Sequence, residues 1–175
     1  MNKFGFILSF MMILSAHLTA AEVDVVRYRF ESNLNDSSGN GYTGESGGSE
    51  SYDVTDQCEG TAALQFPSSS PVSLPAGAIA AIDGATVNIE TYFRMASTPA
   101  GGETIFTAEY SGGNLVLSNA TGVLNLTSTD GLDIDASISM SNLTCYLIRV
   151  ELRPGGTTLK MDGVVRGSSA STVSF

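Results

Sequence analysis

Apolar and polar residues alternate with a period of two along much of this chain, which is the period of a half-buried β-strand. In 87–94 every second residue from Val87 is apolar or threonine, whereas the residues between, from Asn88 on, are polar or amphipathic. We expect the first set to face a core and the second set, which includes Glu90, to meet water. No apolar repeat of 3.6 residues is sustained, so the pattern favours an all-β protein.

The same pattern, with turn residues between the runs, predicts a series of short strands. They cover 23–30, 62–66, 72–74, 87–95, 104–108, 115–118, 123–127, 143–152, 158–161 and 164–166. A long polar loop is expected over 33–51, and a helical turn over 79–82. The segment 153–156 and the pair Asp162-Gly163 indicate hairpins, since glycine accepts positive φ and Asp-Gly suits a type I′ turn. The alternation predicts an antiparallel β-sandwich.

Three of these segments carry a family resemblance. They are Asp-Ser-Ser-Gly-Asn-Gly at 36–41, Gly-Thr-Ala-Ala-Leu-Gln-Phe at 60–66, and Leu-Lys-Met-Asp-Gly-Val at 159–164. In this order and spacing the chain resembles the laminin-G-like, concanavalin-A-like lectin and glucanase domains of secreted bacterial proteins, over nearly all of 25–167. The resemblance implies a jelly-roll β-sandwich that displays a recognition surface.

The chain departs from that family in two places. Tyr92 stands where the family usually has tryptophan, and no counterpart of the family's last strand follows Phe175. A sandwich that lacks this strand would have an open sheet edge beside 23–30, through which the chain could self-associate.

The first residues predict export. Lys3, the apolar run 4–14 and the small residues at 19–21 have the order of a signal peptide that is cleaved after Ala21, with cleavage after Ala20 as the alternative. The apolar run is too short to span a membrane well. We therefore expect a signal peptide at 1–21, one domain at 22–175, and a mature chain in the periplasm, at the cell surface or outside the cell, with no membrane insertion.

Cleavage changes the charge and the available chemistry. The whole chain has a net charge of −10, and loss of Lys3 leaves 7 basic residues against 18 acidic ones, a net charge of −11. Such a charge repels nucleic acid and anionic lipid. The single histidine, His17, is lost as well, which excludes Ser-His-Asp and Cys-His catalysis and His-ligated metal sites.

Two acidic segments are candidate cation sites. Asn35, Asp36 and Asn40 could offer oxygen ligands to a structural Ca²⁺, or could form Asx turns with their own backbone, and the Asx turns are favoured. A second cluster, Asp130, Asp133 and Asp135, is better explained as a solvated strand edge, because nothing in the sequence supplies the six or more oxygens that calcium prefers.

Cys58 and Cys145 are the only cysteines, and an even pair in an exported chain favours a disulfide over two buried thiols. Tyr42, Tyr52 and Tyr110 lie in polar, Gly/Ser-rich surroundings, where a tyrosine ring could stack on a sugar or could cover the edge of the core.

No catalytic pattern is present. The nearest approach to the Glu-x-Asp-x-x-Glu strand of the related glucanases is Glu22 to Arg27, which ends in arginine. We therefore expect a binding module and not an enzyme, one that recognises a carbohydrate or a protein partner at the cell surface. The alternative is a structural or adhesin subunit of a surface assembly, completed by a β-strand of another chain.

Overall fold

The computed structural model describes residues 6–8, 12–18, 21–46, 51–55, 57–66, 72–81, 87–95, 102–110, 113–171 and 173. They form antiparallel strands in three sheets, together with the helix α1 (Ala76–Ala81). The large sheet contains β1 (Phe6–Leu8), β2 (Met12–Leu18), β3 (Ala21–Tyr28), β5 (Ser51–Asp53), β6 (Ala63–Phe66), β8 (Val87–Arg94), β13 (Cys145–Arg153), β14 (Gly156–Met161) and β15 (Val164–Ser169). The second contains β9 (Gly102–Tyr110), β10 (Gly113–Ala120), β11 (Val123–Ser128) and β12 (Asp133–Ser139), and the third pairs β4 (Glu45–Ser46) with β7 (Val72–Ser73).

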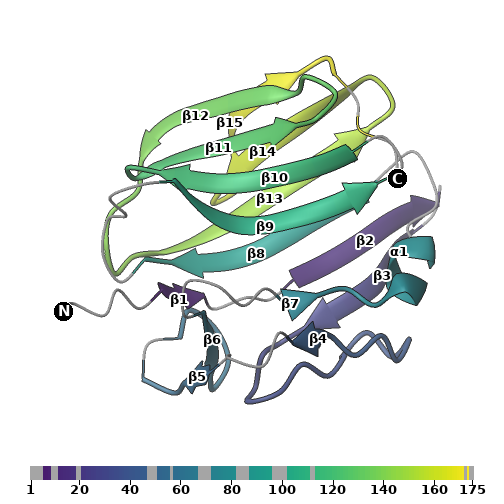
Figure 1. The fold of residues 1–175 in the computed structure, drawn as a ribbon, viewed down its shortest axis with the longest axis vertical. Helices are drawn as coiled ribbons and strands as arrows, with labels where there is room; N and C mark the ends of the chain where they lie inside the picture. Colours follow the sequence, from purple (N-terminus) through teal and green to yellow (C-terminus); the bar gives the residue numbers. More distant parts are fainter. Residues whose placement is uncertain are drawn as a thin grey trace.

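The two larger sheets pack face to face. In Figure 1 the four-stranded sheet β12-β11-β10-β9 lies over β8, β13, β14 and β15 of the nine-stranded sheet. This arrangement confirms the antiparallel β-sandwich that the alternation predicts.

The core between these sheets consists of every second side chain of the facing strands. Ile148, Val150 and Leu152 of β13 are buried, as are Leu115 and Leu117 of β10, while their strand neighbours are more exposed. Full burial of such a side chain contributes about 1.5–3 kcal/mol, so these rows hold the two layers together.

At one edge of the sandwich the layers come very close. A Cβ atom built on Gly167 of β15 would lie 2.3 Å from Cγ2 of Ile134 on β12, and Ile134 is buried. Glycine at this position therefore allows the last strand to approach the edge strand of the opposite sheet.

Strands β1 and β2 connect two parts of the nine-stranded sheet. β2 pairs antiparallel with β3 on one side and with β8 on the other, and β1 lies between β8 and β6. Every described strand pairing that links β3, β5 or β6 to β8 therefore runs through β1 or β2. Both strands fall within residues 1–21, and the cleavage of this segment stays a prediction. We call β1 and β2 the bridging strands.

The predicted hairpins are present. Asp162 and Gly163 have φ values of 52° and 76°, as a type I′ turn requires, and they join β14 to β15. β13 and β14 pair up to Arg153 and Gly156, on either side of Pro154-Gly155.

Most of the expected strands are found, with corrections. The strands that were not predicted are β1, β2, β4, β5 and β12. β4 falls within the expected polar loop at 33–51, and β12 pairs with β11 along the edge of the four-stranded sheet. The outer face of β8 does not meet water as expected, because Asn88 is 1% exposed and Glu90 is 7% exposed. The cause is that β8 lies between two strands. The register with β13 sets Arg149 opposite Glu90 and Glu151 opposite Asn88, and β2 pairs with the same residues from the other side.

The predicted helical turn at 79–82 is part of α1, and Ile82 lies outside the described residues. Among the described residues, no helix is long and apolar enough to cross a membrane.

Candidate functional site

The loop that contains Asn35, Asp36 and Asn40, the candidate calcium ligands, holds β3 in place. Both oxygens of Asp36 accept hydrogen bonds: Oδ1 accepts from the backbone N–H of Arg27 (3.0 Å) and of Ser38 (2.8 Å), and Oδ2 accepts from Ser38 Oγ (2.8 Å) and from the N–H of Tyr42 (3.0 Å). The bond from Ser38 N–H closes an Asx turn. Asp36 thus joins a loop to a strand.

Other groups of this loop bind the same side of β3. Ser37 donates its N–H and its hydroxyl to the carbonyl of Arg27 (2.7 and 2.9 Å), and Asn40 Nδ2 donates to the carbonyl of Val25 (3.0 Å). The segment 36–40 therefore covers the edge of β3 over Val25 to Arg27, where another strand could otherwise pair.

Calcium binding at Asn35, Asp36 and Asn40 stays a prediction. A cation on the Asp36 carboxylate would compete with four donors for its lone pairs, and Asn40 turns its amide nitrogen toward β3. Within the described part of the chain, no group of three or more His, Cys, Asp or Glu side chains is arranged to hold a metal ion.

The three candidate tyrosines lie on different elements. Tyr42 accepts a hydrogen bond at its carbonyl from the Tyr28 hydroxyl (2.6 Å), and its ring approaches Gly77 of α1. Tyr42 and Tyr52 of β5 are half-buried against the core. Tyr110 ends β9, and its side chain lies outside the described residues. The two described rings pack as covers of the core edge, and sugar binding by these residues stays a prediction.

A different surface brings many hydrogen-bonding side chains together, on the outer face of the four-stranded sheet. The strand registers align two rows there, and we call them the polar face. One row is Thr107, Val116, Thr127 and Asp133, and the other is Thr104, Ser118, Asn125 and Asp135. Each row takes one residue from each of β9, β10, β11 and β12, and all eight side chains are exposed or half-buried.

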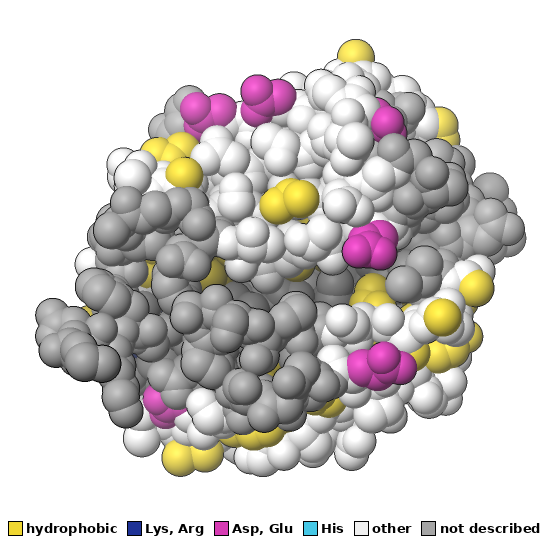
Figure 2. Space-filling view, viewed as in Figure 1, with side chains coloured by type: hydrophobic (Ala, Val, Ile, Leu, Met, Phe, Trp, Pro, Cys, Tyr) yellow, Lys and Arg dark blue, Asp and Glu magenta, His cyan; other side chains and the backbone are white. Residues whose placement is uncertain are grey.

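The polar face differs in charge from the sheet behind it. Residues 102–139, which include all four of its strands, contain five acidic residues and no lysine or arginine. By contrast β8, β13, β14 and β15 carry five of the eight basic residues. Figure 2 looks onto this side of the sandwich, where acidic side chains stand among uncharged polar surface.

Two of the three residues of the predicted acidic cluster belong to this face. Asp133 and Asp135 are exposed on β12, which is an edge strand of its sheet, and Asp130 lies in the preceding turn. These positions confirm the expectation of a solvated strand edge.

The outer face of the opposite sheet is an ion-pair network across three strands. Arg149 of β13 pairs with Glu90 of β8, and Lys160 Nζ of β14 lies 2.6 Å from Glu151 Oε1. Arg153 Nη2 donates to Asn88 Oδ1 (2.7 Å). Burial alone would raise the pKa of Glu151, but the hydrogen bond from Lys160 and the charges of Lys160, Arg153 and Arg149 lower it below its usual value. The side chains of this network pair mainly with one another across the strands, so the polar face is the better candidate for recognition.

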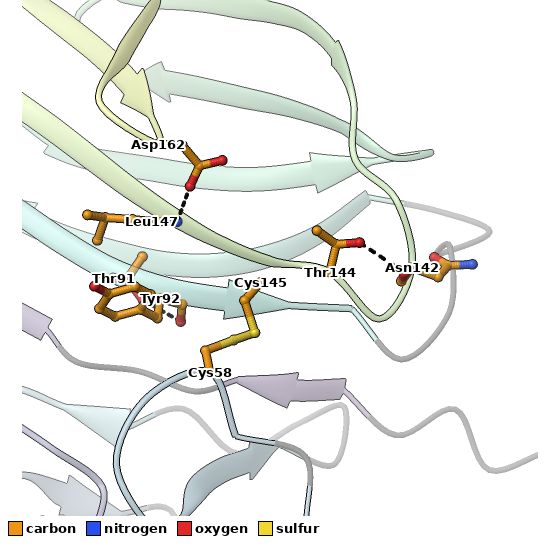
Figure 3. Close-up of a disulfide and its surroundings, with 8 residues drawn as sticks. All are labelled: Cys58, Thr91, Tyr92, Asn142, Thr144, Cys145, Leu147 and Asp162. Carbon is orange, nitrogen blue, oxygen red and sulfur yellow. Dashed lines mark hydrogen bonds between the residues drawn. A yellow bond between two sulfur atoms is a disulfide. The ribbon is translucent and has the colours of Figure 1, made fainter.

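The structure joins Cys58 and Cys145 in a disulfide, as predicted, with a Cα–Cα distance of 5.5 Å. Figure 3 shows the bond passing from the segment before β6 to the start of β13, near Tyr92 on β8. Burial raises the pKa of Tyr92, and the charges of Glu59 and Asp162 raise it further. The bond connects the two parts of the large sheet that the bridging strands also connect.

Comparisons with protein-family models, with curated proteins and with solved structures found no match to this chain.

Sequence reasoning did not identify the polar face. Two signals were present: the Ser, Thr and Asn residues of 104–127, several of which alternate with leucines, and the absence of lysine and arginine from 95–148. Neither signal shows which rows lie side by side, because the register between strands is set by tertiary pairing.

Proposed function

We propose that this chain is an exported, non-catalytic recognition module and that its polar face binds carbohydrate. The observation that carries the proposal is the pair of rows in which hydroxyl, amide and carboxylate groups from four strands lie side by side. Neighbouring strands are about 4.8 Å apart, so these groups form a regular array of donors and acceptors that suits the hydroxyls of a sugar chain.

The charge of the polar face narrows the ligand class. Five acidic residues and no basic ones in 102–139 disfavour polyanions such as acidic polysaccharides, nucleic acid or anionic lipid. Neutral glycans and amino sugars are therefore the ligands that we propose. The outward-facing residues of the polar face alternate with buried ones, and Leu117 and Leu126 behind the face are 0% exposed. This packed core gives the face a rigid backing, which suits the display of a recognition surface that the laminin-G-like resemblance implies.

Substitution on the two faces of the sandwich tests the proposal. We expect the exported chain to bind neutral or amino-sugar glycans on an array. Asn125→Ala combined with Thr127→Ala should weaken that binding about 5- to 150-fold, since each hydrogen bond contributes about 0.5–1.5 kcal/mol. The matched control is Thr158→Ala, a half-buried threonine on β14 of the opposite sheet, which should bind as the unchanged chain does.

A second pair of variants distinguishes the polar face from the tyrosines. If Tyr42→Ala or Tyr52→Ala abolishes glycan binding in a folded protein while the variant of Asn125 and Thr127 binds normally, the polar face is not the site. Binding to no glycan in any form of the chain would contradict the carbohydrate proposal and would leave a protein ligand.

A further inference from the structure

The strand position between β3 and β8 is filled by residues that the sequence marks for removal. β2 pairs with β3 from Met12↔Tyr28 to Leu18↔Ala21, and with β8 from Ile13↔Glu90 to Ala16↔Val87. It is antiparallel to both neighbours. The residues of β2 also form the second half of the predicted signal peptide, which ends at Ala21.

Cleavage after Ala21 would leave β3 and β8, the strands on either side of this position, without a partner there. Alternate residues of a strand direct their N–H and C=O groups to opposite sides, and β8 uses one side for β13. The groups of Val87 to Glu90 that now face β2 would be unpaired, and so would those on the inner side of β3. Val87, Asn88 and Ile89 are at most 2% exposed in the present structure, so an empty position would uncover buried groups. Unpaired buried backbone groups are costly, and an edge of this kind recruits another strand.

We propose that removal of residues 1–21 converts this position into a strand-accepting site, which is filled by an extended segment of a different polypeptide. The segment runs antiparallel to both β3 and β8. It places apolar residues opposite Val87 and Ile89, whose side chains belong to the core, and uncharged residues opposite Asn88 and Glu90. The chain's own residues in these registers, Ala16, Leu14, Ser15 and Ile13, carry no charge.

The charge of the chain favours a different polypeptide over a second copy of this chain. The mature chain has a net charge of −11, so identical copies repel each other at close range. The other side of β3 is covered by the loop of Asp36, Ser37 and Asn40, so an incoming strand can reach β3 only from the side that β2 leaves. A partner segment with basic residues flanking its apolar core suits this charge best.

Core packing and the disulfide keep the two parts of the large sheet together after cleavage. Without the bridging strands, no described ladder joins β3, β5 and β6 to β8, but Cys58 and Cys145 still link the segment before β6 to β13, the neighbour of β8. β3 lies outside the loop that this bond closes, and its Val26 and Tyr28 are buried in the same core cluster as Ile89 of β8. This site lies on a different sheet from the polar face, so the two proposals stand or fall separately.

A synthetic peptide tests the inference. The probe is the sequence of Met12–Leu18 with added lysines for solubility and a fluorophore at one end. We expect fluorescence anisotropy to show that the probe binds saturably to the exported chain. At a peptide concentration of about 100 times the Kd, hydrogen exchange of the newly paired amides in 87–90 should slow about 100-fold. A peptide carrying Leu14→Pro should bind at least about tenfold more weakly, because proline cannot donate within a central strand.

The matched control is the whole chain, refolded without signal peptidase. Its own β2 fills the position, so it should not bind the probe, and its amides at 87–90 should already be protected. Equal binding of the probe to both chains would contradict the inference. An exported chain that retains residues 1–21 would also contradict it. So would an exported chain whose amides at 87–90 are protected without peptide, whether as a monomer in which β3 pairs with β8 or as a dimer in which a second copy fills the position.

Discussion

A single side chain, Asp36, organises the region where the chain leaves β3. The sequence suggested this residue for its oxygen atoms, and the choice between an Asx turn and calcium depended on where the backbone donors lie. In the structure four donors from three parts of the chain meet its carboxylate. Burial raises the pKa of Asp36, but the hydrogen bonds from Arg27, Ser38 and Tyr42 outweigh it, and the pKa lies below its usual value.

This lowered pKa predicts a dependence of stability on pH. Because the folded pKa is below the unfolded value of about 3.9, the charged carboxylate stabilises the fold above that pH, and this contribution is lost as the pH falls through the folded pKa. Asp36→Asn should lower the free energy of unfolding at pH 7 by about 1–3 kcal/mol, and the difference from the unchanged chain should shrink toward pH 3. Urea unfolding at pH 7, 5 and 3 measures it. Asp133→Asn, on the exposed side of β12, is the control, and a gap that is constant with pH would contradict the assignment.

At the scale of elements, the sequence predicted strands well where the residues themselves favour them. β8 combines alternation with β-branched and aromatic residues, and its bounds are nearly those predicted. β12 reads Asp-Ile-Asp-Ala-Ser-Ile-Ser, and although it alternates, its aspartates and serines have low β-propensity. Pairing with β11 outweighs that propensity. The burial of Glu90 was not predictable either, because it depends on Arg149, a residue 59 positions away that only the register brings opposite.

The close approach of β15 to β12 predicts an effect of one methyl group. Gly167→Ala places a Cβ atom 2.3 Å from Ile134 Cγ2, so that the strands must separate or Ile134 must move. We expect a loss of about 1–3 kcal/mol in the free energy of unfolding, as for other overpacked sites. Ser168→Ala, at the exposed neighbouring position, should change it little. When Gly167→Ala is combined with Ile134→Ala, the loss in the free energy of unfolding should be smaller than the sum of the losses of the two single variants. Strict additivity would show that this contact is not the cause.

At the scale of the whole molecule, the disulfide closes a loop of 87 residues. A loop of this length should contribute about 3–5 kcal/mol, mainly by restricting the unfolded chain. Thiol labelling of the unfolded, unreduced exported protein should therefore find no free cysteine, and reduction should lower the melting temperature. A variant with Cys58→Ala and Cys145→Ala should melt at the same temperature with and without reductant. Two labelled thiols in the exported protein would contradict the assignment.

The uneven placement of charge gives the sandwich an electric dipole. The strands β8, β13, β14 and β15 carry five basic and two acidic residues, whereas 102–139 carries five acidic residues and no basic ones. Within about 8–10 Å of an anionic surface, the Debye length at physiological salt, the surface field would exert a torque on such a molecule. The torque would turn the strands with a positive net charge toward the surface and the four-stranded sheet away from it. We therefore expect an anionic surface to orient the protein before any specific contact forms, with its hydroxyl- and amide-bearing rows directed outward.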